Sequence, residues 1–235
     1  MNAVRFTIGA GAALWVGYAW GAHLVMPGCI WRGPREGRRI ALTFDDGPDH
    51  DWTPRVLDVL AARGVPATFF LIGERARRAV GVVRAIVSAG HEIGNHGWSH
   101  RSLWLCGPAR TREEITRAQH VLAELAGTGP RFFRPPWGMV NASMFSVLRA
   151  SRLTCVFWSI QPEGLRSQPG SRQVAYVLRR ARPGAIVDLH DAEGVLDAPA
   201  RLLQALPAMI DGLREAGYDF ATLDGLLAGA KAQER

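Results

Sequence analysis

The sequence predicts an α/β protein built on a parallel sheet, and three observations lead to this fold class. From residue 39 onward, short apolar runs alternate with longer amphipathic stretches about seven times. The chain has 235 residues, 48% of them hydrophobic, which suits one buried domain with a short appendage. Neither an internal repeat nor a low-complexity segment interrupts the pattern. Such a sheet closes into a barrel or stays open and doubly wound, and either form places a functional site at the carboxyl ends of its strands.

Each element has its own local signal. Apolar runs indicate buried strands and amphipathic stretches indicate helices. Thr53-Pro54 is a favoured helix opening, and Thr111 and Glu114 have the spacing of a capping box. The predicted strands are residues 39–44, 67–72, 92–95, 131–134, 154–159, 185–190 and 219–222. The predicted helices are residues 53–63, 77–89, 111–125, 142–150, 173–182 and 200–216.

An apolar run precedes this α/β pattern. Residues 6–31 contain no Asp, Glu, Lys or Arg, and about twenty apolar residues suffice to cross a bilayer as a helix. A polar region with a small-residue cleavage site is not evident, which favours a retained anchor over a cleaved signal peptide. We therefore expect an N-terminal transmembrane helix within a membrane anchor over residues 1–31, a linker over 32–38 and the catalytic domain over 39–230.

Charge and cysteine content narrow the classes of partner. The formal charge is +7, and Lys231 is the only lysine, so arginine carries nearly all the positive charge. A basic protein favours anionic partners such as phospholipid surfaces or acidic glycans. The arginines are not gathered with aromatic residues, so nucleic-acid binding is not expected. Cys29, Cys106 and Cys155 form no CxxC pair, and we expect them to be small buried residues without a disulfide framework.

Two acids stand where the first predicted strand ends. Asp45 and Asp46 follow the apolar run 40–44 directly. Adjacent carboxylates beside an apolar strand repel each other and lose hydration unless a proton or a cation compensates. A divalent metal is the simplest compensation. An acidic turn is the alternative, because Asp-Gly-Pro is ordinary turn chemistry.

Three more polar segments follow other strands. His96 and His100 are spaced to lie on one face of a helical turn and share one ion, for which neutral imidazole suits Zn²⁺. Arg134 stands after a short strand, where a guanidinium can orient a carboxylate. His190 ends another strand and is suited to proton transfer near neutral pH. Together with the two acids, these residues predict a metal site with open positions for water and substrate.

These segments resemble the polysaccharide deacetylase domain, also called NodB-like or carbohydrate esterase family 4. Four motifs of that family stand here in the expected order, and the resemblance spans about residues 38–229. They are TFDDG at 43–47, HxxxH at 96–100, the RxPWG type at 134–138 and LHD at 189–191. The resemblance implies a distorted (β/α) barrel of about seven parallel strands. It also implies a hydrolase that removes an acyl group from an amino sugar.

The resemblance assigns roles to the metal half of the site. Asp46, His96 and His100 correspond to the metal ligands, and the divalent ion is most often zinc. Asp45 corresponds to the general base, which takes a proton from water, and Arg134 to its orienting partner.

The resemblance also assigns roles on the acid side. His190 corresponds to the general acid that protonates the departing amine. The backbone N–H of Trp137 corresponds to an oxyanion donor, and Pro136 beside it is expected to contact substrate.

The chain departs from the family pattern near His190. The usual acidic residues and tryptophan of the fourth motif are replaced after Ser159, and the usually apolar position 188 is Asp188. One hypothesis is that Asp188 or Glu163 supplies the missing carboxylate that tunes His190. The alternative is that Asp188 pairs with an arginine elsewhere in the barrel. Asp191, in the same motif as His190, is a further candidate site residue.

Three functions are compatible with these residues. The first is removal of an N-acetyl or other N-acyl group from an amino sugar in a polysaccharide, an oligosaccharide or a lipid-linked glycan. The second is deformylation of a lipid-linked amino sugar, and the third is an inactive, membrane-anchored carbohydrate-binding relative. A single-pass anchor in a bacterial-type inner membrane is expected, but two clues to its orientation conflict. The arginines after the run place the domain inside, whereas enzymes of this type often work outside.

Overall fold

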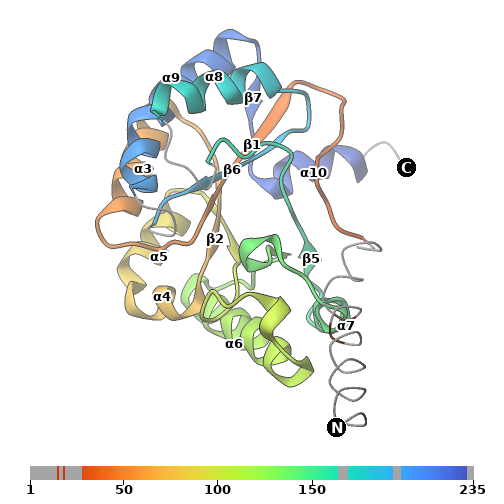
Figure 1. Ribbon diagram of the computed structural model, residues 1–235. Coiled ribbons are helices and arrows are strands. Elements are labelled where there is room, and N and C mark those ends of the chain that lie inside the picture. The colour runs from red at the N-terminus through yellow and green to blue at the C-terminus, as the bar shows by residue number, and fades with distance from the viewer. Residues whose placement is uncertain (1–14, 16–17, 19–27, 164–168, 193–196, 232–235) are drawn as a thin grey trace, which may run out of the picture.

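The computed structural model describes residues 28–163, 169–192 and 197–231, together with Trp15 and Tyr18. Within these ranges seven parallel strands form one curled sheet, in which β5-β4-β3-β2-β1-β6 are neighbours in that order and β7 pairs with β1 (Figure 1). The strands are β1 (Arg39–Asp45), β2 (Thr68–Leu71), β3 (Glu92–Asn95), β4 (Phe132–Phe133), β5 (Thr154–Cys155), β6 (Ile186–His190) and β7 (Asp219–Phe220). The predicted α/β class with about seven parallel strands is confirmed.

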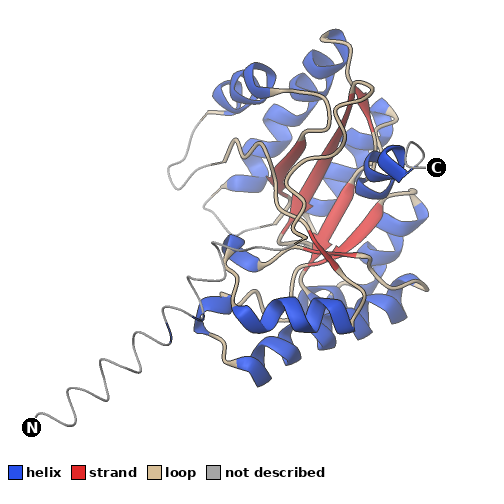
Figure 2. Ribbon diagram, turned by 90° about the vertical axis from the view of Figure 1, so that its right-hand side faces the viewer, coloured by secondary structure: helices blue, strands red, loops and turns tan. Residues whose placement is uncertain are grey.

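Helices surround the sheet, which lies in the centre of the molecule (Figure 2). Those between the strands are α3 (Trp52–Arg63), α4 (Gly73–Arg78), α5 (Val80–Ser88), α6 (Pro108–Ala126), α7 (Ala142–Ala150), α8 (Gly170–Arg180) and α9 (Ala198–Glu215). The last described helix is α10 (Leu223–Lys231). Short 3₁₀ turns, η1 (Leu103–Leu105) and η2 (Pro136–Gly138), lie in the loops near the site.

Side chains of the central strands alternate between two faces, as strand geometry requires. In β1, Ile40, Leu42 and Phe44 belong to the main hydrophobic core beneath the helices. In the neighbouring β6, Val187 and Leu189 pack into that same core. The intervening residues of both strands therefore point into the curl of the sheet, and this inner face carries the polar residues of the candidate site.

The inner face is apolar at its amino-terminal end. Ala41 and Ile186, which are paired across β1 and β6, pack there with Phe70. Leu223 and Leu226 of α10 complete this small core. The bottom of the half-barrel is thus filled by side chains, and the polar residues of the candidate site lie toward the carboxyl ends of the strands.

The chain after β5 bends across the open side of the curl. Backbone pairing joins Ile160 to Val187 of β6, and on the other side of the segment Ile30 pairs with Val156. The N–H of Ile30 donates to Cys155 O at 2.9 Å, and the N–H of Phe157 donates to Ile30 O at 2.7 Å. Residues around Ile30 therefore form part of the folded domain.

Several predicted boundaries were wrong. The expected helix 77–89 is two helices, α4 and α5, which are separated at Ala79, where the backbone leaves the helical region. The expected strand 154–159 is regular only over Thr154–Cys155. The predicted capping box does not form. Helix α6 begins at Pro108, and Glu114 instead accepts hydrogen bonds from Ser99.

The predicted membrane anchor lies almost entirely outside the described residues, which include only Trp15, Tyr18 and residues 28–31 of it. No helix within the described part of the chain is both long and apolar enough to span a bilayer. Residues of the predicted linker contact the domain, since the N–H of Gly33 donates to Gly184 O at 2.7 Å.

Candidate active site

The candidate metal ligands come from the loops after β1 and β3. Asp46 follows the last residue of β1 and has a left-handed backbone with φ of 73°, and His100 has φ of 56°. Non-glycine residues adopt this conformation at a cost, and such residues cluster at functional sites. The ligand atoms of Asp46, His96 and His100 all lie within 4.8 Å of one another. The structure therefore brings the three predicted ligands together.

The chemistry of these three residues fits a divalent cation. Asp46 Oδ1 is 2.9 Å from His100 Nε2 and 3.5 Å from His96 Nε2, yet it is buried and accepts no hydrogen bond from the described residues. His96 Nδ1 is 2.8 Å from Arg134 O, so a proton on Nδ1 leaves the Nε2 lone pair for a metal. Burial by itself would lower the pKa of His96, but the charges of Asp45 and Asp46 raise it above its usual value. The site therefore attracts positive charge.

The loop that carries both histidines is held from two sides. Asn95 Oδ1 accepts from the N–H of Gly97 at 2.9 Å, and Glu114 of α6 accepts from the N–H and the hydroxyl of Ser99.

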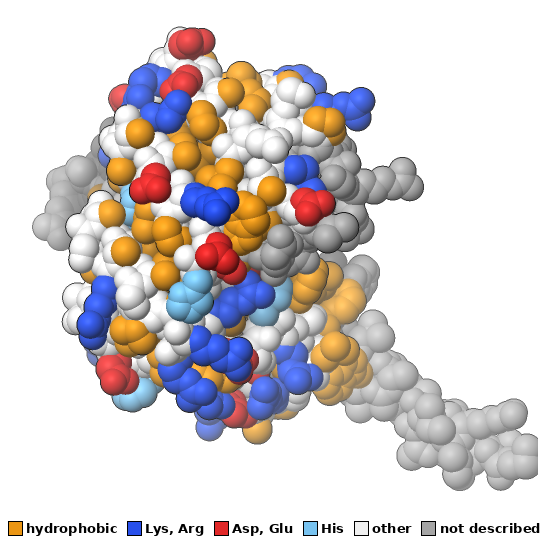
Figure 3. Space-filling model, turned by 90° about the vertical axis from the view of Figure 1, so that its left-hand side faces the viewer, with side chains coloured by type: hydrophobic (Ala, Val, Ile, Leu, Met, Phe, Trp, Pro, Cys, Tyr) orange, Lys and Arg blue, Asp and Glu red, His pale blue; other side chains and the backbone are white. Residues whose placement is uncertain are grey.

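The Trp98 ring of the same loop contacts two guanidinium groups, Arg77 of α4 at 5.1 Å and Arg117 of α6 at 3.9 Å. Arginine side chains gather on the lower part of the face shown in Figure 3, where α4 and α6 pack together. These contacts fix the backbone between His96 and His100.

Arg134 lies at the centre of the inner face and is completely buried. Its Nη1 donates to Asp45 Oδ1 at 2.7 Å, Thr43 Oγ1 at 2.8 Å and Asp188 Oδ1 at 3.1 Å. Its Nη2 and Nε donate to the carbonyls of Phe157 at 3.0 Å and Val156 at 3.3 Å. The guanidinium therefore fixes the orientation of Asp45, as predicted for the partner of a base.

His190 is the last residue of β6 and lines the same cavity as the three candidate metal ligands. Its Nδ1 is hydrogen-bonded to Glu163 Oε2, while Asp188 is paired with Arg134. Burial by itself would lower the pKa of His190, but the carboxyls of Asp188 and Glu163 raise it well above its usual value. Of the two candidate carboxylates, Glu163 is the one that contacts His190. Asp188 contacts Arg134, as the alternative for this residue proposed.

Asp191 supports the site from behind and does not line the cavity. It is fully buried and accepts a hydrogen bond from the Thr53 hydroxyl at 2.5 Å. Its carboxyl lies so close to Gly47 that a Cβ there would be 2.7 Å from Oδ2. Burial raises the pKa of Asp191 to about 7. The contact explains the need for glycine directly after Asp46.

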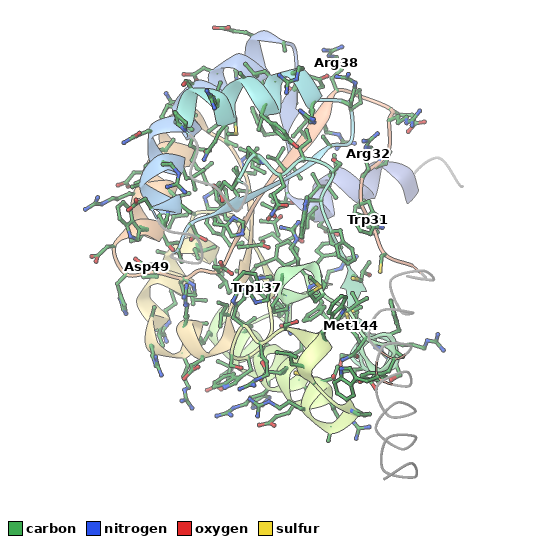
Figure 4. The ribbon with its side chains drawn as sticks, viewed as in Figure 1. Trp31, Arg32, Arg38, Asp49, Trp137 and Met144 are labelled. Atoms are coloured by element: carbon green, nitrogen blue, oxygen red, sulfur yellow. The ribbon has the colours of Figure 1, made fainter. Side chains whose placement is uncertain are left out.

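A cavity of about 390 Å³ joins these groups. Trp137 (Figure 4) lies at its edge with 55% of its surface exposed. Its ring centroid is 5.0 Å from that of His100. Pro136 is buried and does not line the cavity, whereas its neighbour Pro135 does. The cavity is lined by Asp45, Asp46, His96, His100, Pro135, Trp137, Gly138, Met139, Trp158, Gln161, Glu163, Asp188 and His190.

Comparison with known proteins decides the family. The family model described as polysaccharide deacetylase matches residues 32–156, more than half of the 235 residues. The chain belongs to the polysaccharide deacetylase family. It is therefore a hydrolase of the carbohydrate esterase family 4 type, and its polysaccharide deacetylase homologues act on N-acetyl amide bonds.

Individual polysaccharide deacetylases are similar over most of the chain. A peptidoglycan-N-acetylglucosamine deacetylase from Bacillus cereus is 33% identical and covers 86% of this chain and 73% of its own. A chitooligosaccharide deacetylase from a Bradyrhizobium species is 35% identical, with coverage of 80% and 90%. The crystal structure of the Bc1960 peptidoglycan N-acetylglucosamine deacetylase superposes with a TM-score of 0.82 at 31% identity, covering 88% of this chain and 96% of that one.

Some residues of this deacetylase site were not predicted from the sequence. Thr43 accepts from Arg134 and donates to Val187 O at 2.7 Å, and Thr53 holds Asp191. Met139 and Gln161 line the cavity from loops. Thr43 shares the strand face of Asp45, so period-two alternation was a usable signal for it. The loop residues follow no such pattern.

Proposed function

We propose that this polysaccharide deacetylase is a metal-dependent N-deacetylase of an amino sugar in a glycan or glycolipid. The observation that carries the proposal is the convergence of a ligand triad, an arginine-held carboxylate and a carboxylate-held histidine on one cavity. The amide of an N-acetyl sugar needs each of these groups, because water must be activated and a poor leaving amine must be protonated.

Asp46, His96 and His100 would hold the ion, and the set of two imidazoles and one carboxylate suits zinc. When bound, such an ion polarises a carbonyl and lowers the pKa of water. Asp45 is not needed as a ligand in this arrangement. Its Oδ1 is held by Arg134, and Oδ2 lies 3.8 Å from His96 Nε2, so the carboxylate faces the position where water is activated. We assign it the role of general base.

His190 supplies the proton for the amine. Its raised pKa keeps the ring protonated near neutral pH, and the contact of Nδ1 with Glu163 leaves Nε2 to face the cavity. Trp137, at the cavity edge, is the candidate for the oxyanion contact through its backbone N–H and for stacking on a sugar ring through its exposed indole.

The test is metal content together with acetate release. Purified protein loaded with Zn²⁺ is expected to release acetate from oligomers of N-acetylglucosamine. Asp46→Ala is expected to lose bound zinc and at least about 99% of activity, as when a ligand or catalytic group is removed. Asp58→Ala, which changes an exposed acid on α3, is the matched control and should retain both. Full activity in a zinc-free Asp46→Ala protein would contradict the proposal.

The deformylase and carbohydrate-binding alternatives gain no specific support from the described residues. If zinc-loaded protein released neither acetate nor formate from any N-acyl sugar while Asp46→Ala bound glycans normally, the binding alternative would replace the proposal. The same assay with N-formyl substrates separates the two enzymatic functions.

We also propose that the apolar run 6–31 holds the enzyme on a bilayer. The support is its composition, and the contacts of Ile30 join the end of the run to the domain. The protein is expected in the membrane fraction and to leave it with detergent but not with high salt. A reporter fused to the carboxyl terminus would reveal the side on which the domain lies.

A further inference from the structure

The cavity constrains how an N-acyl sugar can enter. The groups that act on the amide, Asp45 and His190, end β1 and β6 at the same level, because they are Cα partners in the sheet. The bulky, hydrated sugar must stay on the open side, where Trp137 is exposed. The acyl substituent therefore points into the curl of the sheet. There it meets the side chains that stand two residues before Asp45 and His190 on the same strand face.

One pleat deeper lie Thr43 and Asp188, which are also Cα partners. The Thr43 hydroxyl is engaged on both sides, since it donates to Val187 O and accepts from Arg134. Asp188 lines the cavity and is only 1% exposed. The floor beneath the acyl group is therefore a buried carboxyl, although a methyl group would be best received by an apolar floor.

Asp188 is incompletely hydrogen-bonded. Arg134 Nη1 carries two hydrogens and faces three acceptors, and its contact with Asp188 is the longest of the three, at 3.1 Å against 2.7 and 2.8 Å. Among the described residues, Asp188 Oδ2 has no hydrogen-bond partner. Burial, followed by the charge of Asp45, raises the pKa of Asp188 to about 8. Near neutral pH the carboxyl can therefore both donate and accept.

We propose that Asp188 selects N-acyl groups that carry a hydroxyl on the carbon next to the carbonyl, of which hydroxyacetyl is the smallest. A hydroxyl donates and accepts, so it satisfies Asp188 in either protonation state, whereas the methyl of an acetyl group does neither. The reaction is the same hydrolysis: the amide C–N bond breaks, water oxygen joins the acyl carbon, and hydroxyacetate and a protonated amino sugar are formed. The inference rests on the proposed function and names its substrate class.

The test compares one chito-oligosaccharide carrying N-hydroxyacetyl, N-acetyl or N-formyl groups, with the zinc-loaded full chain. We expect kcat/KM for the hydroxyacetyl substrate to exceed that for the acetyl substrate by about tenfold or more. Asp188→Leu should reverse this preference and Asp188→Asn should retain part of it, because the amide still forms hydrogen bonds. As a readout independent of turnover, hydroxyacetate should bind the wild-type protein more tightly than acetate does in a calorimetric titration, and the difference should vanish in Asp188→Leu.

A matched control separates selection from general damage. Glu163→Gln alters the acid side without touching the floor, so it should slow both substrates by the same factor. Zinc content and thermal midpoint identify any variant that fails to fold. Equal or better use of the acetyl substrate by the wild type, or preference for the formyl substrate, overturns the inference while leaving the proposed function intact. Release of no acid from any of the three overturns the proposed function itself.

Discussion

At the scale of single residues, Glu163 takes over the contact with His190 that the altered fourth motif had left open. Its Oε2 bonds the ring, and the described residues give its buried Oε1 no partner. A negative charge so placed favours the protonated imidazole. The acid side of the site is thus assembled from a loop carboxylate instead of the usual motif position.

Glu163→Gln is therefore expected to change the pH dependence of turnover. His190 must be protonated to act as the proposed general acid, so activity should fall as pH rises through its pKa. Because the Glu163 charge raises that pKa, its removal should move the alkaline limb of the kcat/KM profile to lower pH by about one unit or more. Glu124→Gln, an exposed change on α6, is the control. An unmoved alkaline limb would disprove the tuning role.

The sequence allowed the metal half of the site to be predicted better than the acid half. Asp45 ends β1, and Asp46 and the histidine loop follow β1 and β3, so their positions relative to the sheet could be inferred from alternation and spacing. Glu163 lies in a loop without periodicity, and only the fold brings it to His190. The partner of Asp188 could not be chosen either, since Arg134 reaches it across the sheet.

At the scale of elements, the junction of α6, α7 and η1 depends on one buried side chain. Asn141 caps α7 by accepting from the N–H of Met144 at 3.0 Å. Its amide nitrogen donates to Leu103 O, Cys106 O and Thr111 Oγ1. The residue is fully buried, so these three elements share a single polar hub.

Asn141→Ala should lower the free energy of unfolding by about 2–4 kcal/mol, because it removes a helix cap and leaves buried acceptors unpaired. Urea denaturation measures the loss. Ser146→Ala on the exposed face of the same helix is the control and should stay within about 0.5 kcal/mol of wild type. If both variants unfolded at the same urea concentration, Asn141 would not be a hub.

Element types were more predictable than element limits. The runs that form β1, β2 and β6 are apolar enough to identify, since both faces of these strands are largely covered. The break at Ala79 was missed because Ala is a good helix former, so nothing local marks the interruption. The capping box failed because Glu114 serves the histidine loop, a tertiary contact that local spacing cannot reveal.

At the scale of the whole molecule, the segment that enters the domain also supports the active site. Trp31 stacks on Phe157 with ring centroids 4.1 Å apart, and the Phe157 carbonyl holds Arg134 Nη2. Figure 4 shows Trp31 next to Arg32 on the described segment that leads into β1. These contacts connect Trp31, at the end of the predicted anchor, through Phe157 to Arg134, the partner of the proposed base Asp45.

A chain shortened to begin at residue 38 should therefore be less stable than one that begins at residue 28. We expect a difference of about 2–4 kcal/mol in the free energy of unfolding, from lost strand hydrogen bonds and the lost aromatic stack. Deacetylase activity should fall as well, because the backbone around Phe157 is released. Trp31→Ala in the longer chain should give a smaller loss of the same sign. Equal unfolding curves for the two lengths would show that residues 28–37 are only a tether.

The left-handed backbone at the cavity has a consequence for laboratory evolution. Asp46, His100 and Trp137 all have positive φ, between 56° and 73°, a conformation that costs on the order of 1 kcal/mol or more for each such residue. Glycine or asparagine would relieve that cost, so a selection for heat resistance alone should accumulate such replacements, most readily at Trp137, where no metal contact is lost. The selected variants would be more stable and less active, so a library must be screened for catalytic activity and thermal stability in the same round.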